Sequence, residues 1–167
     1  MTKDEYAKFA RGVVKATRGL IAKVPADRLD WRPDPSFLTM GSVVRHVAET
    51  VGEGLKAVMD GGWGIHFEGG GGGLPPAEAF PSVRSVQEGL DLIDADWKLF
   101  EERFAKVDEK TLNAQVVKIP WMAPETTLAE YMLHTVEHLS NHRMQLFLYL
   151  RLIGLKVNTA TLYGGGD

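Results

Sequence analysis

Cysteine is absent from the 167 residues of the chain. Without thiols the chain can form no disulfide, cannot build a cysteine-ligated zinc finger and cannot use cysteine as a catalytic nucleophile. Any thiol chemistry would therefore need a thiol from a small-molecule cosubstrate.

Long apolar runs and a surplus of positive charge are also missing. The longest strongly apolar stretch, residues 146–150, is far shorter than the ~20 residues of a membrane span, and no signal-peptide pattern follows the N-terminus. Lysine and arginine number 19 against 22 acidic residues, a formal net charge of −3, whereas nucleic-acid binding needs a basic face. We expect a soluble, cytoplasmic protein that binds neither membranes nor nucleic acid.

Four segments have the three- and four-residue spacing of apolar side chains that is typical of amphipathic helices. They cover residues 3–24, 39–60, about 82–107 and 127–153. Capping boxes are expected at Thr2 with Glu5 and at Thr127 with Glu130, because a hydroxyl and a carboxylate satisfy free backbone N–H groups. Gly154 is expected to end the last helix.

The connections between these helices differ in kind. The segment of about residues 60–81 is rich in glycine, and its length is unusual inside a domain, so we expect a flexible loop that crosses the molecule. Residues 115–119 could form a short strand, and the tail, about residues 155–167, is expected to fray. The sequence therefore predicts one all-α domain over residues 1–167, a four-helix bundle with a crossover connection.

Three of the five histidines are evenly spaced on the last predicted helix. His134, His138 and His142 follow at four-residue intervals, which places them on one narrow face at ~100° per residue. Two histidines at this spacing can bind one metal ion. His134 and His142 lie about 12 Å apart along the axis, too far to share an ion at bond lengths of about 2.1 Å. One of the three histidines must therefore lie outside a metal site formed by the other two. The alternative interpretation is that the row is a solvated stripe on the helix surface.

His46 is placed similarly on the second predicted helix, at the edge of its apolar arc. Histidines at such edges would line a groove between core and solvent, which is where an open metal site is expected. His66 lies in the glycine-rich loop, and its role stays open.

Three stretches of the chain resemble the DinB/YfiT-like superfamily of bacterial four-helix metalloproteins. Leu29–Pro33 (LDWRP) is similar to its tryptophan-proline turn, and Ser42–Ala48 (SVVRHVA) is similar to its second-helix histidine motif. His138–Gln145 (HLSNHRMQ) resembles its His-x-x-x-His-Arg-Gly-Gln signature, with Met144 in place of the glycine.

The resemblance implies a bundle with a crossover, often dimeric, and a metal triad. Carried over by position, the ligands are His46, His138 and His142, with His134 as a bystander. All-nitrogen ligation suits a divalent transition metal, with zinc or nickel favoured. Members of the superfamily include transferases and isomerases that depend on low-molecular-weight thiols.

Three imidazoles leave a coordination position for water or an incoming thiolate. We expect a metal-dependent enzyme such as a thiol-dependent S-transferase; the alternatives are a hydrolase that uses metal-bound water and a non-catalytic, metal-binding, dimeric stress-response protein. Candidate acid–base residues are Glu137, Glu49 and His134. Arg143 falls within the apolar stripe of the last helix, where it could anchor an anionic group, or pack its stem while its head snorkels to solvent or pairs with a carboxylate.

A homodimer is a further expectation. Residues 147–153 carry more apolar side chains than one helix face can direct into a single core. They are Phe147, Leu148, Tyr149, Leu150, Leu152 and Ile153.

Overall fold

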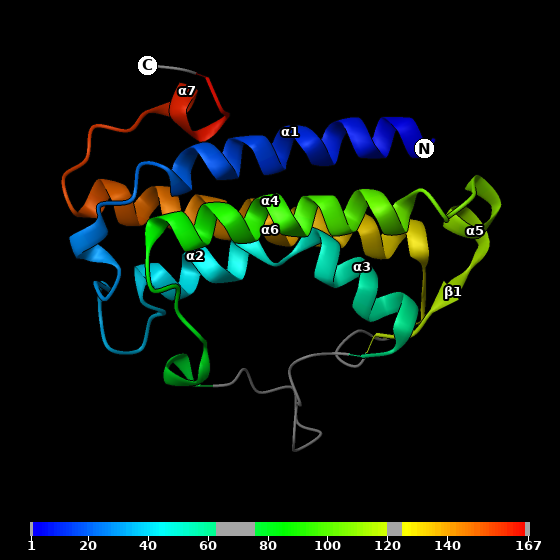
Figure 1. Cartoon of the computed structure of the whole chain (residues 1–167), viewed down its shortest axis with the longest axis horizontal. Helices are drawn as coiled ribbons and strands as arrows, with labels where there is room; N and C mark the ends of the chain where they lie inside the picture. The colour runs from blue at the N-terminus through cyan, green and yellow to red at the C-terminus, as the bar shows by residue number, and fades with distance from the viewer. Residues whose placement is uncertain (1, 63–75, 120–124, 166–167) are drawn as a thin grey trace.

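Four helical segments pack side by side in the structure, a computed structural model that describes residues 2–62, 76–119 and 125–165 (Figure 1). They are α1 (Lys3–Ile21), the consecutive pair α2 (Met40–Ala48) and α3 (Val51–Asp60), α4 (Val86–Phe104), and α6 (Leu128–Leu152). Shorter elements are two 3₁₀ turns (Ala26–Arg28 and Ala77–Ala79), α5 (Glu109–Ala114), β1 (Val116–Val117), β2 (Thr126–Thr127) and α7 (Thr159–Leu162). The predicted all-α four-helix bundle is confirmed.

The order of the helices requires a crossover, as predicted. In Figure 1, α2 and α3 run in the same direction as α4, and α3 ends at the opposite end of the bundle from the start of α4. Two parallel neighbours cannot be joined by a tight turn, so this pair requires a crossover connection. The glycine-rich residues 63–75, His66 among them, lie outside the described residues.

The helix ends follow the local sequence signals closely. Thr2 and Thr127 both form complete capping boxes with the glutamate three residues later. Gly154 follows α6 in the left-handed region, with φ +89°, a conformation that glycine adopts without the strain of a side chain. The short strand expected within residues 115–119 forms as β1 and pairs antiparallel with β2, which directly precedes α6.

The second predicted helix differs from the expectation because it is broken into two. The break lies at Glu49 and Thr50, and the carboxylate of Asp96, on α4, accepts the backbone N–H groups of Val51, Gly52 and Glu53 at 2.8–3.0 Å. A carboxylate from another helix thus satisfies the first donors of α3 and allows a new helix to begin there. Helical periodicity alone gives no signal for such a cap.

The C-terminal tail, as far as the structure describes it (residues 155–165), also differs from the expectation of fraying. Residues 159–162 form α7, which packs against α1, and Val157 and Leu162 bury their side chains. Gly164, with φ +78°, lies so close to Ala16 that an added Cβ would come within 3.2 Å of its Cα. Two buried apolar side chains thus anchor a segment that its glycines lead us to expect to be flexible.

The core runs along the whole bundle and ties the N-terminal and C-terminal helices together. Tyr6 on α1 is fully buried, and its hydroxyl donates to the carbonyl of Met132 on α6 at 3.0 Å.

Among the described helices, none has both the length and the apolar character needed to cross a bilayer.

Candidate metal centre

His46 lies in the last turn of α2, at the edge of the bundle core. Val43, Val44 and Val47 are buried on the core-facing side of the helix, which leaves the imidazole half-buried beside them. Thr50 donates its hydroxyl to the His46 carbonyl at 2.6 Å, and α2 ends two residues after the histidine, at Ala48.

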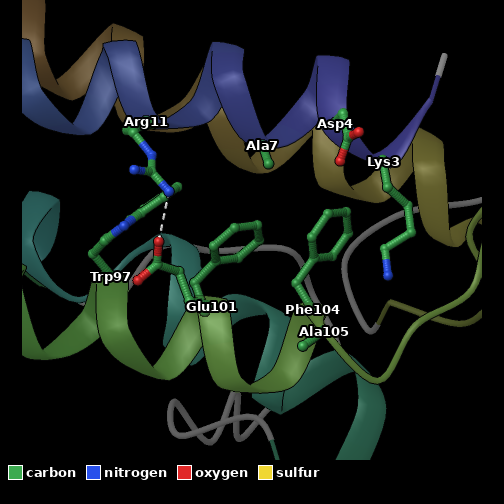
Figure 2. A pocket seen from close by; sticks show the side chains of 9 residues that line it. Lys3, Asp4, Ala7, Arg11, Trp97, Glu101, Phe104 and Ala105 are labelled. Atoms are coloured by element: carbon green, nitrogen blue, oxygen red, sulfur yellow. Dashed lines mark hydrogen bonds and ion pairs between the residues drawn. The ribbon is translucent and has the colours of Figure 1, made fainter.

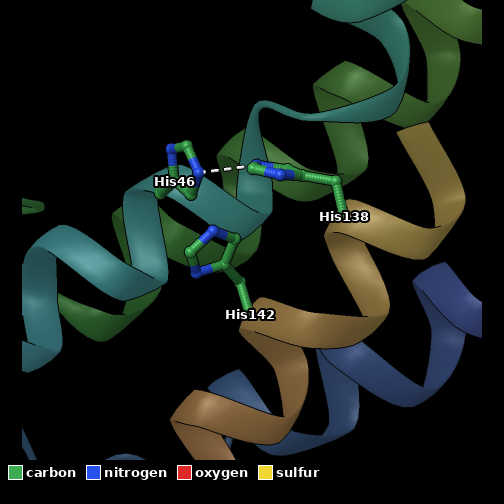
Figure 3. A group of neighbouring side chains, drawn as sticks. All are labelled: His46, His138 and His142. Atoms are coloured by element: carbon green, nitrogen blue, oxygen red, sulfur yellow. Dashed lines mark hydrogen bonds between the residues drawn. The ribbon is translucent and has the colours of Figure 1, made fainter. Parts of the chain in front are cut away.

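His138 and His142 lie one turn apart on α6. The neighbouring Leu139 and Leu146 are buried in the core, so the two imidazoles project from the adjoining edge of the helix. The register predicted from their four-residue spacing therefore places both rings towards α2 (Figure 3).

The three imidazoles converge on one point (Figure 3). One ring nitrogen from each of His46, His138 and His142 can be chosen so that all lie within 4.8 Å of one another, and the Nε2 atoms of His46 and His138 are 2.8 Å apart. Tetrahedral coordination with bonds of about 2.1 Å separates ligand nitrogens by about 3.4 Å, so small side-chain adjustments suffice. The triad could hold a metal ion.

The electrostatics of the triad favour neutral imidazoles, the form that ligates metals. Burial, followed by the proximity of His142 and His138, lowers the pKa of His46 to about 3. Burial and His142 lower the pKa of His138 to about 4, even though that residue as a whole is exposed. Among the described residues the metal-capable group contains no carboxylate, so a divalent ion would keep its double positive charge.

Two further contacts at the triad come from Gln145, which the sequence analysis named only as the end of the signature-like stretch, and from Phe80, which it did not name. The Nδ1 atom of His142 lies 2.7 Å from Oε1 of Gln145, and Phe80 meets the His46 ring edge-on at 5.9 Å between centroids. The three-residue spacing from His142 to Gln145 was a signal for the first contact. Phe80 lies in the connection between α3 and α4, and nothing in its local sequence links it to His46.

The other sequence-predicted candidates lie outside this group. His134 is exposed, and its Nδ1 contacts the carboxylate of Glu137, also exposed, at 3.3 Å. Glu49 forms an ion pair with Arg45 at 3.0 Å. His66 belongs to the residues that are not described.

Arg143 packs its side chain into the bundle, one of the two alternatives left by the sequence. Its guanidinium lies over the Tyr163 ring, 5.6 Å from the centroid, and burial lowers its pKa. Its Nε atom is buried without a hydrogen-bond partner within the described ranges. No carboxylate among the described residues forms an ion pair with it, and its contact is with the tail rather than the triad.

A separate hollow of about 240 Å³ lies between α1 and α4 (Figure 2). Arg11 crosses its rim to pair with Glu101 at 2.7 Å, and Lys3 lies over the Phe104 ring. None of the triad histidines lines this hollow, so it is not part of the candidate metal centre.

Comparison with known proteins points to one family. The model of the DinB superfamily matches residues 11–146, a range that includes all three triad histidines. No curated protein matches the chain.

Three solved structures are similar to this chain over nearly the whole length of both proteins. A DinB-like protein from Bacillus cereus ATCC 10987 has a TM-score of 0.71 at 17% identity, covering 93% of this chain and 95% of that one. A DinB-like protein from Bacillus subtilis has a TM-score of 0.66 at 14% identity, covering 92% and 94%. A candidate DinB family member from Exiguobacterium sibiricum 255-15 has a TM-score of 0.64 at 20% identity, covering 95% and 96%. At these identities the likeness shows the fold alone.

Proposed function

The chain belongs to the DinB superfamily, and from that premise we propose that it is a metal-dependent enzyme that transfers groups to a low-molecular-weight thiol. His46, His138 and His142 would bind one divalent transition metal, zinc or nickel. The observation that carries the proposal is the convergence of three imidazoles, from two helices, on one point free of described carboxylates.

The donor set supports a reactive site more than a structural one. Imidazole nitrogens suit zinc and nickel, and structural zinc sites usually close with four protein ligands. Only three ligands converge among the described residues. A bound ion would supply an open coordination position at which water or a thiol loses its proton more readily.

The charge balance supports an anionic partner at that position. Three neutral imidazoles leave the charge of a divalent ion uncompensated, which favours an anionic fourth ligand such as a thiolate. The chain has no cysteine, so the sulfur would come from a cosubstrate. In the transfer, the sulfur forms a bond to an electrophilic carbon, the leaving group departs with its electron pair, and the thiol proton passes to solvent.

The metal site is tested by metal analysis of untagged protein and its single alanine variants. Wild type should contain close to one equivalent of zinc or nickel, and His46→Ala, His138→Ala and His142→Ala should each lose most of it. His134→Ala is the matched control from the same helix row and should keep its metal. Full retention of metal in His138→Ala would contradict the proposal.

The reaction class is tested by turnover with and without added thiol. Turnover of electrophilic substrates that requires a thiol supports the S-transferase. Turnover of ester or amide substrates without thiol would instead indicate a hydrolase that uses metal-bound water. A fourth ligand that no small molecule can exchange would indicate a non-catalytic metal protein.

We also propose that the chain forms a homodimer through the outer face of α6. Part of the apolar surplus predicted there is buried in the core, including Phe147, Tyr149 and Leu150. Leu148 and Leu152, one turn apart on α6, stay 49% and 65% exposed. Exposed apolar side chains that lie together on one helix face support an interface with a second copy of the chain.

A further inference from the structure

A chain of three hydrogen bonds runs from the triad to the segment that precedes α2. Nδ1 of His142 lies 2.7 Å from Oε1 of Gln145, Nε2 of Gln145 donates to the Tyr149 hydroxyl at 3.1 Å, and that hydroxyl donates to the Leu38 carbonyl at 3.1 Å. Within the described part of the chain, His142 is the triad member whose second ring nitrogen has a hydrogen-bond partner in the protein.

The hydrogen bond from Tyr149 to Leu38 fixes the donor-to-acceptor direction of all three hydrogen bonds. A backbone carbonyl only accepts hydrogen bonds, so the single hydroxyl proton of Tyr149 must point at Leu38. The Tyr149 oxygen is then free to accept, which requires the amide nitrogen of Gln145 to face it. The Gln145 oxygen must therefore face His142, and the ring nitrogen there must carry the proton.

The tautomer of His142 follows from this direction. With the proton on Nδ1, the lone pair of the neutral ring lies on Nε2, the atom left to face His46 and His138. Histidines that bind metals usually donate their other N–H in this way, and the partner sets the orientation of the ring as well as its tautomer.

Packing also holds the end of the hydrogen-bond chain that lies away from His142. Tyr149 is almost fully buried, and the edge of its ring meets Trp31 at 5.4 Å between centroids. The Trp31 carbonyl accepts the N–H of Met40, the first residue of α2. The chain thus joins a ligand on α6 to the start of the helix that carries His46.

We infer that Gln145 is a positioning residue that holds His142 as the Nδ1–H tautomer, and that Tyr149 holds Gln145 in the required direction. The consequence for metal binding rests on the proposed function, whereas the tautomer does not. The two can therefore fail separately.

The first test reads the tautomer by ¹⁵N NMR of the imidazoles in metal-free protein. Wild-type His142 should carry its proton on Nδ1. Gln145→Leu removes the acceptor at similar volume and should give a mixture of tautomers, while Gln145→Glu keeps an acceptor and should restore Nδ1–H. Wild-type His142 protonated on Nε2, or an unchanged tautomer in Gln145→Leu, would overturn the inference.

The second test titrates the same proteins with cobalt(II), whose visible spectrum reports ligand geometry. Gln145→Leu should weaken cobalt binding about 10- to 100-fold with an altered spectrum, the range typical for loss of such a partner, and Gln145→Glu should recover most of it. Glu137→Leu is the matched control, because it removes the same type of i+3 contact from His134 and should change neither readout. Affinity in Gln145→Leu within twofold of wild type would overturn the positioning role in metal binding.

Tyr149→Phe keeps the inference testable if the Gln145 variants do not fold. Loss of the hydroxyl frees Gln145 to turn its amide, so His142 should again show a mixture of tautomers. A pure Nδ1–H tautomer in this variant would overturn the role of Tyr149. If wild type binds no metal, the proposed function fails, and the tautomer measurement still decides the inference.

Discussion

The side chain of Asp96 on α4 accepts the backbone N–H of Gly52 on α3 at 2.8 Å, and the two residues touch across the interface of these helices. The same carboxylate also accepts the N–H groups of Val51 and Glu53. One buried acidic side chain thereby sets where α3 begins and how closely it approaches α4, immediately after the helix that carries His46.

Asp96→Asn should lower the free energy of unfolding by about 1–3 kcal/mol. The amide nitrogen cannot accept, so at least one of the N–H groups now bonded to the carboxylate loses its partner in a buried position. Chemical denaturation of metal-free protein at neutral pH measures the loss. Stability equal to wild type would show that the cap does not hold the break in place.

Gly52→Ala should destabilise the protein although alanine is the better helix former. An added Cβ would collide with the backbone oxygen of Asp96, which cannot move aside like a flexible side chain. Gly19→Ala in α1 is the matched control, because no neighbouring atom lies within 4 Å of its added Cβ. It should stabilise the protein by about 0.5–1 kcal/mol, and thermal unfolding of both variants should give shifts of opposite sign.

Metal-free protein should lose stability in acid through His46. Its pKa is about 3 in the folded state and about 6.5 in the unfolded chain, so the unfolded state binds the proton first as pH falls. The contribution is complete above pH 6.5 and should fall by at most about 3 kcal/mol on going to pH 4.5. His46→Asn should therefore show a flatter dependence of the unfolding free energy on pH than wild type.

The comparison with His46→Asn removes the effect of titrating groups that do not contact His46. Asp96 acts in the opposite direction, since burial raises its pKa to about 6 and its contribution is lost as pH rises from about 4 to 6. Both proteins share that carboxyl, so it cancels in their difference. Parallel curves for the two proteins would contradict the shift of His46.

Leu148→Glu combined with Leu152→Glu should convert a dimer into a monomer. Both side chains are exposed on α6, so the charges should cost little in the isolated chain and oppose an apolar interface. Light scattering at micromolar concentration should give twice the chain mass for wild type and the single mass for the variant. A monomeric wild type would contradict the dimer.

Much of the bundle follows from local patterns in the sequence. Three of the four long helices appear close to their predicted ranges, and Thr2 and Thr127 cap the first and the last of these three as their motifs indicate. Helical spacing also predicts that His138 and His142 share a face. These features depend on residues within one or two turns of each other, which is the range over which sequence periodicity carries information.

The features that the sequence analysis missed depend on residues far apart in the chain. The break at Glu49 and Thr50 needs Asp96, more than 40 residues later, and the burial of the tail needs the surface of α1. The hydrogen-bond chain beyond Gln145 needs Leu38, 111 residues from Tyr149. The convergence of His46 with the α6 pair was expected through family resemblance, because spacing on separate helices fixes no distance between them.

The three histidines of the triad come from opposite halves of the chain, and His138 follows His46 by 92 positions in the sequence. A bound ion would therefore act as a crosslink that closes a long loop, and it would favour the folded state by an amount that grows with the logarithm of the free ion concentration above the dissociation constant. Apparent metal affinity and global stability are then two measures of one equilibrium. A substitution anywhere in the core that unfolds the bundle would also release the metal, even if it touches no ligand.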